Sequence, residues 1–137
     1  MAQSLNPYLN FDGTTREAME FYSSVLGGDL TISTFGEFGA PEGVDPNGVM
    51  HAQLTTPAGF TLMASDGPPG QPVTSGSNFS ISLSGDDAAA LRGYWDGLAE
   101  GGQVMMPLEK QMWGDEFGML VDKFGMPWMV NIAGGGS

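Results

Sequence analysis

The sequence predicts one α+β domain built from two copies of the same module, in which a strand and a helix are followed by three strands. Short runs alternate apolar and polar residues, which is typical of strands, and two longer runs repeat apolar residues at spacings of three and four, which is typical of amphipathic helices. The same order of elements occurs in both halves of the 137-residue chain. A chain of this length has room for one core and hardly for a second.

The first module opens with an expected strand over residues 6–12, where Leu9 and Phe11 alternate with polar side chains. The turn at 12–15 offers a helix cap, and the apolar spacing predicts a helix over 16–26 that ends at a glycine pair. Three more strands are expected, the last two joined by the tight turn Thr56-Pro57-Ala58-Gly59. They cover residues 29–35, 49–55 and 60–64.

The second module follows a loop rich in Gly, Pro and Ser at 65–77, which is the expected linker. A strand is expected from Phe79, and Asp86-Asp87 should cap a helix that runs to about Glu100. Three strands then complete the module, at residues 103–107, 117–121 and 127–132.

The two halves can be aligned at a shift of 74 residues, which indicates an internal duplication. This shift pairs Leu9 with Leu83, Asp12 with Asp86, Phe21 with Trp95 and Gly27-Gly28 with Gly101-Gly102. We therefore expect a single domain over residues 1–133, with modules at about 5–66 and 78–133. Residues 134–137 are expected to be a Gly/Ser tail outside the fold.

The charge of the chain limits its partners. Sixteen acidic residues against four basic ones give a formal net charge of -12, which repels nucleic-acid phosphates and anionic membrane surfaces. The same charge fits both a solvated surface and the attraction of a cationic ligand. The chain has no cysteine, which excludes disulfides and thiolate sites, and its lack of a signal-like or membrane-spanning stretch leads us to expect a cytoplasmic protein.

Motifs spread over nearly the whole chain resemble the PhnB-like branch of the vicinal-oxygen-chelate superfamily, which includes glyoxalase I, extradiol dioxygenases and bleomycin-resistance proteins. They are residues 8–13, 18–28, Met50-His51-Ala52, 62–66, Met106-Pro107, Trp113-Gly114, Phe117-Gly118, 122–125 and Trp128-Met129. The resemblance implies two βαβββ modules that form a curved mixed sheet around a cup, with the helices on the outer face. It also implies a homodimer with a ligand or metal site in the cup.

The positions that match the family's metal ligands are Asn6 or Pro7, Met63, Ser80 and Met129. Amide, hydroxyl and thioether groups lack the charge or basicity that a hard or borderline divalent ion requires, so we expect no metal. We also expect no nucleotide-type cofactor, because no Gly-rich fingerprint lies between a strand and a helix.

Strand alternation separates two faces of the predicted sheet. The face under the helices should carry Leu9, Phe11, Leu62, Ile81, Leu83, Trp128 and Val130. The other face should carry uncharged polar side chains and two methionines, a composition suited to a ligand pocket, a wet sheet surface or a dimer contact. The expected ligand-binding residues are Tyr8, Asn10, Gln53, Met63, Ser80, Ser82, Trp113, Met129 and Asn131, with Thr61 on the same face.

His51, the only histidine in the chain, is the candidate catalytic residue. It can act as an acid or base without a metal, or it can be a hydrogen-bonded structural residue. Trp113 can close the mouth of the cup or anchor a turn, and Asp115 and Glu116 beside it can meet a cation or remain solvated.

The function that we expect is metal-independent binding of a small molecule, cationic or aromatic, in the cup. The alternative is a metal-free isomerase or lyase that acts on a small oxygenated metabolite, with His51 as acid or base and Tyr8 or Asn131 polarising an oxygen. Whether the protein is an enzyme stays open, as does a third possibility, a module that only forms dimers.

Overall fold

The computed structural model describes residues 5–40, 42–67 and 78–134. The chain divides into two compact units, Met1–Thr74 and Ser75–Ser137, which we call module one and module two. Module one contains β1 (Tyr8–Phe11), α1 (Thr15–Leu26), β2 (Asp29–Thr34), the 3-10 turn η1 (Phe35–Phe38), β3 (Val49–Thr55) and β4 (Thr61–Asp66). Module two contains β5 (Ile81–Gly85), α2 (Ala88–Ala99), β6 (Gln103–Lys110), β7 (Glu116–Val121) and β8 (Pro127–Ile132).

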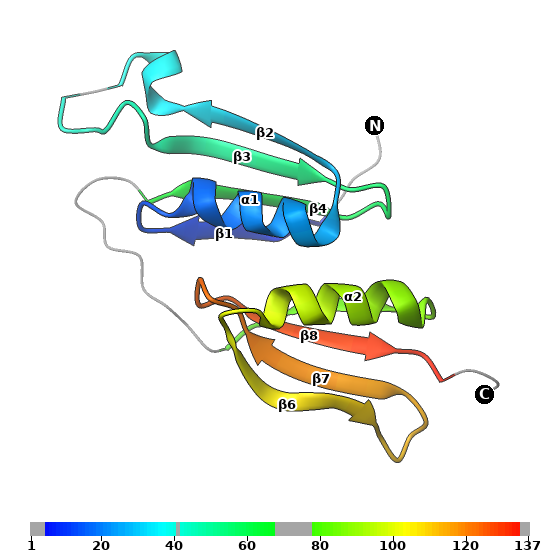
Figure 1. Ribbon diagram of the computed structural model, residues 1–137. Helices are drawn as coiled ribbons and strands as arrows, with labels where there is room; N and C mark the ends of the chain where they lie inside the picture. Colours follow the sequence, from blue (N-terminus) through cyan, green and yellow to red (C-terminus); the bar gives the residue numbers. More distant parts are fainter. Residues whose placement is uncertain (1–4, 41, 68–77, 135–137) are drawn as a thin grey trace. The chain divides into compact units, whose positions relative to one another are not determined.

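Each module forms its own four-stranded mixed sheet (Figure 1). The strand order is β1-β4-β3-β2 in module one and β5-β8-β7-β6 in module two. In both sheets the first and last strands of the module pair in parallel, and the other pairs are antiparallel. The two modules therefore share one topology, and the βαβββ fold predicted from the sequence is confirmed.

One face of each sheet is covered by the helix of the same module (Figure 1). In module one, the side chains of Met19 and Tyr22 on α1 are fully buried, and Leu9 and Leu62 on the sheet are buried as well. In module two, Leu98 of α2 is buried in the same way. All seven predicted core residues are buried: Leu9, Phe11, Leu62, Ile81, Leu83, Trp128 and Val130. Neither 12-residue helix, nor any other helix among the described residues, has the length and apolar content for a membrane crossing.

The glycine pair after each helix has a packing role. A Cβ added to Gly28 would lie 2.2 Å from the carbonyl oxygen of Thr55, and one added to Gly102 would lie 2.4 Å from that of Val121. Only glycine allows the chain leaving each helix to approach the end of the third strand this closely. The predicted pairing of Gly28 with Gly102 thus reflects the same contact in the two modules.

Several strand ends differ from the sequence prediction. β4 continues through Asp66, where the sequence predicts the linker. β6 continues to Lys110, because an edge strand tolerates the proline at position 107. β5 begins only at Ile81, so Phe79 and Ser80 lie before it. The rest of the predicted linker, residues 68–77, is outside the described residues. Gly134 is part of the predicted tail, but it donates its N–H to Asp115 (2.8 Å) and is therefore held to module two.

The start of α1 is capped by a side chain from β4. Thr14 is the N-cap residue but makes no side-chain cap bond. Instead, the N–H of Thr15 donates to Oδ1 of Asp66 (3.2 Å), and the N–H of Val49 donates to Oδ2 of the same carboxylate (2.8 Å). The predicted local cap is therefore wrong for α1. It is right for α2, where Asp87 accepts the N–H of Ala90 (3.1 Å).

Candidate functional site

The face of the module-one sheet that α1 leaves uncovered carries most of the predicted polar residues. Tyr8 pairs with Met63, Met63 pairs with Gln53, and Gln53 pairs with Thr31, so one row crosses all four strands. Paired residues share a face of the sheet. Met63 and Gln53 are partly exposed, and Tyr8 is 46% exposed. We call this surface the open face of module one.

His51 lies on this open face, two residues before Gln53 on β3. The phenol oxygen of Tyr8 lies 3.1 Å from Nδ1 of His51, and the two rings are 5.7 Å apart between centroids. In one tautomer the phenol donates to Nδ1, and in the other Nδ1–H donates to the phenol oxygen. The structure thus joins His51, the predicted acid or base, to Tyr8, which was one of the two residues predicted to polarise an oxygen.

Two further predicted residues lie on the same face. Asn10 is exposed, and its Oδ1 accepts a hydrogen bond from the hydroxyl of Ser65 (3.3 Å) on the parallel neighbour β4. Thr61, at the start of β4, is partly exposed. This open face therefore offers hydroxyl, amide, imidazole and phenol groups to the solvent.

Module two has an equivalent open face on the side away from α2. Ser82 on β5 pairs with Met129 on β8, and the next row joins Ser84 to Asn131. Ser82 is exposed, and Met129 and Asn131 are partly exposed. Ser80 is exposed but lies before the strand, so the sheet register does not fix it on this face as the sequence had indicated.

Asn131 is held by a carboxylate from the loop between β6 and β7. Its Nδ2 donates to Oδ2 of Asp115 (3.0 Å), whose Oδ1 accepts the N–H of Gly134 (2.8 Å). The Asn131 amide, followed by the Gly134 N–H, lowers the pKa of Asp115 below its usual value, because both bonds favour the ionised carboxylate. Glu116 forms an ion pair with Arg92. Asp115 and Glu116 thus both have partners within module two. Neither is a solvated loop charge without a partner.

Trp113 lies in the same loop and is 59% exposed. The loop is closed by backbone bonds from Gln111 N–H to the Asp115 carbonyl (2.8 Å) and from Gly114 N–H to the Gln111 carbonyl (3.0 Å). The indole ring lies 6.2 Å from the ring of Phe117 between centroids, in a tilted arrangement. Since Phe117 pairs with Asn131 on the open face, Trp113 stands beside the end of that face.

Sequence reasoning missed several residues of the open faces. Phe117 and Met119 alternate along β7 with the buried Gly118 and Leu120, and this alternation was available as a signal. Ser65 was missed because it had been assigned to the linker. The place of Met106 depends on a register shift in the pairing of β6 with β7, which a local pattern cannot reveal.

The positions that the family resemblance implies for metal ligands carry neutral side chains in both modules. Module one has Asn6 or Pro7 and Met63 there, and module two has Ser80 and Met129. Such neutral groups are poor ligands for zinc, nickel or iron in the absence of imidazole or carboxylate. In residues 5–40, 42–67 and 78–134, no group of three or more His, Cys, Asp or Glu is placed to hold a metal ion.

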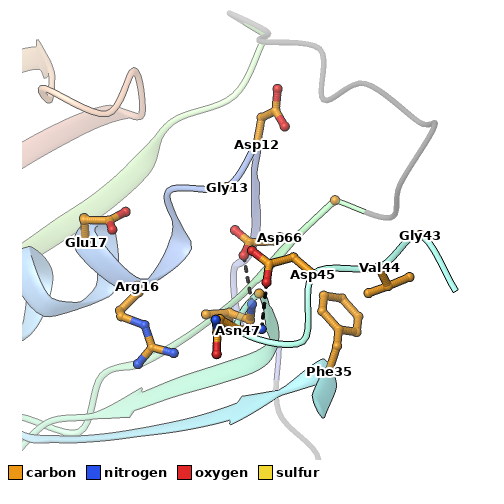
Figure 2. A pocket seen from close by; sticks show the side chains of 13 residues that line it. Asp12, Gly13, Arg16, Glu17, Phe35, Gly43, Val44, Asp45, Asn47 and Asp66 are labelled. Atoms are coloured by element: carbon orange, nitrogen blue, oxygen red, sulfur yellow. Dashed lines mark hydrogen bonds between the residues drawn. The ribbon is translucent and has the colours of Figure 1, made fainter. Parts of the chain in front are cut away.

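A separate pocket of about 450 Å³ lies in module one beside the start of α1. Figure 2 shows Arg16 on one side of Asp66 and Phe35 on the other. Asp66 is the carboxylate that caps α1 and binds the start of β3, so it builds this pocket as well. The lining also includes Asp12, Glu17 and Asp45. This pocket was not predicted, because its residues come from four separate stretches of the sequence.

Comparison with known proteins gives consistent matches over almost the full chain. A family model described as 3-demethylubiquinone-9 3-methyltransferase matches residues 3–131. The crystal structure of protein PA1353 from Pseudomonas aeruginosa has 40% sequence identity and a TM-score of 0.84, and the match covers 97% of this chain and 99% of that one. A putative 3-demethylubiquinone-9 3-methyltransferase, PhnB protein, from Bacillus cereus has 27% identity and a TM-score of 0.76, over 96% and 100% of the chains.

A more distant structure has the same fold. The glyoxylase/bleomycin resistance protein/dioxygenase domain from Frankia sp. EAN1pec has 12% identity and a TM-score of 0.67, over 100% of this chain and 96% of that one. At this identity the likeness concerns the fold alone. It agrees with the strand order seen in each module.

Proposed function

Since the chain belongs to the 3-demethylubiquinone-9 3-methyltransferase family, the PhnB-like branch of the vicinal-oxygen-chelate superfamily, we propose that it binds a small organic molecule without a divalent metal ion. The open faces of the two sheets are the proposed binding surfaces. The observation that carries this proposal is their composition: partly exposed, uncharged polar groups and methionines stand on strands whose opposite faces are buried.

The two open faces offer different chemistry. Module one supplies hydrogen-bonding groups around the Tyr8 and His51 pair, which suit oxygen or nitrogen atoms of a ligand. Module two supplies thioethers and the ring of Phe117, with Trp113 beside them, which suit a flat apolar or aromatic group. The open face of module one therefore fits polar groups, and the open face of module two fits an aromatic group.

A positive charge on the ligand is the second part of the proposal. The net charge of -12 raises the local concentration of cations around the protein and speeds their encounter with it. We therefore propose basic aromatic compounds as the first class to test, with neutral aromatic compounds as the comparison.

Thermal stabilisation measures this binding directly, because a ligand that binds only the folded state raises its stability. The protein is screened after dialysis against chelator, with basic and neutral aromatic compounds in parallel. Compounds that co-purify with the protein, identified by mass spectrometry, join the same screen. We expect at least one aromatic compound to raise Tm in the absence of metal.

Matched variants locate the binding surface. Tyr8→Phe and His51→Gln change the open face of module one, whereas Glu20→Gln changes an exposed residue of α1. For a compound that binds the open face of module one, we expect the first two to reduce the stabilisation and the third to retain it. A compound that stabilises all three variants as it does the wild type would place its site elsewhere, and a complete absence of stabilising compounds would contradict the proposal.

The alternative function, a metal-free isomerase or lyase, is favoured by one observation. His51 has a hydrogen-bonding partner, Tyr8, on the same exposed face, and an imidazole oriented by a second group is a common arrangement for a general base. Under this proposal Tyr8 holds the imidazole while His51 moves a proton on the ligand. Its test is turnover of stabilising compounds: loss of product in His51→Gln with retained binding supports it, and an absence of product from the wild type rejects it.

We further propose that the protein is a cytoplasmic homodimer. The edge strand β6 supports the dimer, since Val104 and Met105 are 44% and 59% exposed, and apolar side chains on an edge strand are commonly covered by a partner. Sedimentation of the wild type tests this proposal. A monomer at micromolar concentration would contradict it.

A further inference from the structure

Three methionines form a continuous row across three neighbouring strands of module two. Met106 on β6 pairs with Met119 on β7, and Met119 pairs with Met129 on β8. Met119 and Met129 belong to a regular antiparallel ladder, so they share a face with their Cβ atoms about 4.5–5.5 Å apart. Met106 pairs with Met119 at an irregular point of β6, with a register shift on each side of it. The row therefore brings three thioethers to one place from positions that lie 10 to 23 residues apart in sequence.

Met119 and Met129 are on the open face, Met106 is paired with Met119, and all three side chains can be reached by solvent. Met106 is 42% exposed, and Met119 and Met129 are partly exposed. Their strand neighbours Leu120 and Trp128, which point the other way, are each only 1% exposed. The methionine side chain is unbranched and has three rotatable bonds, so the three sulfurs can turn toward a common point above the sheet.

The chemistry of the donors selects one class of ion. Thioether sulfur is a soft, neutral ligand that suits Cu(I) and ions like it, whereas hard or borderline divalent ions prefer oxygen or nitrogen. The chain has no cysteine to compete for a soft ion, and its negative charge favours any cation.

We propose that Met106, Met119 and Met129 form a binding site for one soft monovalent cation of the Cu(I) class. The site shares only Met129 with the positions that the family resemblance implies for a divalent ion, because Met106 and Met119 lie outside those positions. The inference also goes beyond the proposed function, since binding of the ion depends on sulfur, whereas the organic ligand needs only the shape and polarity of the face.

Silver(I) is a suitable probe, because it is soft and monovalent and needs no reductant. The protein is labelled with carbon-13 at its methionine methyl groups and titrated with silver nitrate in chloride-free buffer. We expect the methyl signals of Met106, Met119 and Met129 to shift together and to saturate at one ion per chain. The signal of Met19, which is fully buried under α1, and that of Met112, which is 98% exposed in the β6–β7 loop, should stay in place.

A matched pair of variants separates sulfur ligation from apolar contact. Met119→Leu keeps nearly the same volume and apolar character but removes the central sulfur, so we expect silver affinity to fall by about tenfold or more. Met112→Leu removes an isolated sulfur, and silver affinity should be unchanged. The thermal melting curve of each variant shows that it remains folded.

Equal silver affinity in Met119→Leu and the wild type would overturn the proposal, as would a parallel response of Met112 with the three row residues. The organic ligand gives an independent comparison. If Met119→Leu keeps the thermal stabilisation by an aromatic compound but loses silver, the two kinds of binding are separate. If the wild type does not bind silver but is still stabilised by the aromatic compound, only the proposed ion site is rejected.

Discussion

Tyr8 and His51 are joined by a hydrogen bond of 3.1 Å on the open face of module one, although 43 positions separate them in sequence. The contact is diagonal, because Tyr8 pairs in the sheet through Met63 with Gln53, two residues beyond His51. It fixes the orientation of the only imidazole in the chain. The acid-base alternative depends on this orientation.

The first prediction concerns this pair. A double-mutant cycle with Tyr8→Phe, His51→Gln and the double variant should give a coupling of about 0.5–1.5 kcal/mol in unfolding free energy, the usual net value of a hydrogen bond. Urea unfolding followed by tryptophan fluorescence measures it. Strict additivity of the two single changes would show that the contact has no energetic role in solution.

The second prediction concerns the close approaches at Gly28 and Gly102. Alanine at either position forces its Cβ against backbone atoms of the neighbouring turn, so each change should destabilise the protein by about 1–3 kcal/mol or more. Gly28→Ala should be the more damaging, since Gly28 also has a φ of 99°. The Tm of each variant, measured by thermal unfolding, shows which of the two changes destabilises the protein more.

Gly93→Ala is the control for this pair. Gly93 lies inside α2, and nothing lies within 4 Å of a Cβ added there, so alanine should stabilise the helix by about 0.5–1 kcal/mol. Equal effects at Gly93 and Gly102 would mean that the close approach at Gly102 does not exist in solution.

The third prediction concerns Asp122, which is 3% exposed at the turn between β7 and β8. Its Oδ2 accepts the indole N–H of Trp128 (2.8 Å), and its Oδ1 accepts the N–H groups of Phe124 (2.8 Å) and Met126 (3.1 Å). Asp122→Ala should lower the unfolding free energy by about 1–3 kcal/mol, because the buried donors would be left unpaired. Asp96→Ala, on the exposed side of α2, should change it little.

The fourth prediction concerns acid pH and Asp115. Its pKa is lowered in the folded state by the Asn131 amide and the Gly134 N–H, so its contribution to stability is complete above the unfolded pKa of about 4. That contribution is lost as the pH falls through the lower folded pKa. The side-chain amide signal of Asn131 should therefore shift only below about pH 4. Asp115→Asn should abolish this step, and a step near neutral pH would contradict the assignment.

The fold was predictable because each module carries local periodicity of its own. Strand alternation around Leu9 and Leu83, together with helical spacing after Asp12 and Asp86, indicated both modules and the seven buried core residues. The errors occurred where long-range contacts decide the outcome. Asp66 extends β4 because its carboxylate binds the backbone at Thr15 and Val49, and neither partner is near it in sequence.

The open faces were predictable only in part, for the same reason. Alternation assigned single residues such as Gln53 and Met129 to the correct side of a strand. Register determines which of them become neighbours, and it joined Tyr8 to His51 and aligned Met106 with Met119 through an irregular pairing. The cup formed by both modules, the dimer and the ligand remain predictions.

Equilibrium binding of an aromatic ligand to chelator-treated protein, with the metal content of the same sample measured, tests the central proposal most directly. We expect saturable binding of one ligand per chain, with no bound zinc, nickel or iron and with affinity unchanged by adding these ions. Binding that appears only when such an ion is supplied, together with one ion retained per chain, would contradict it.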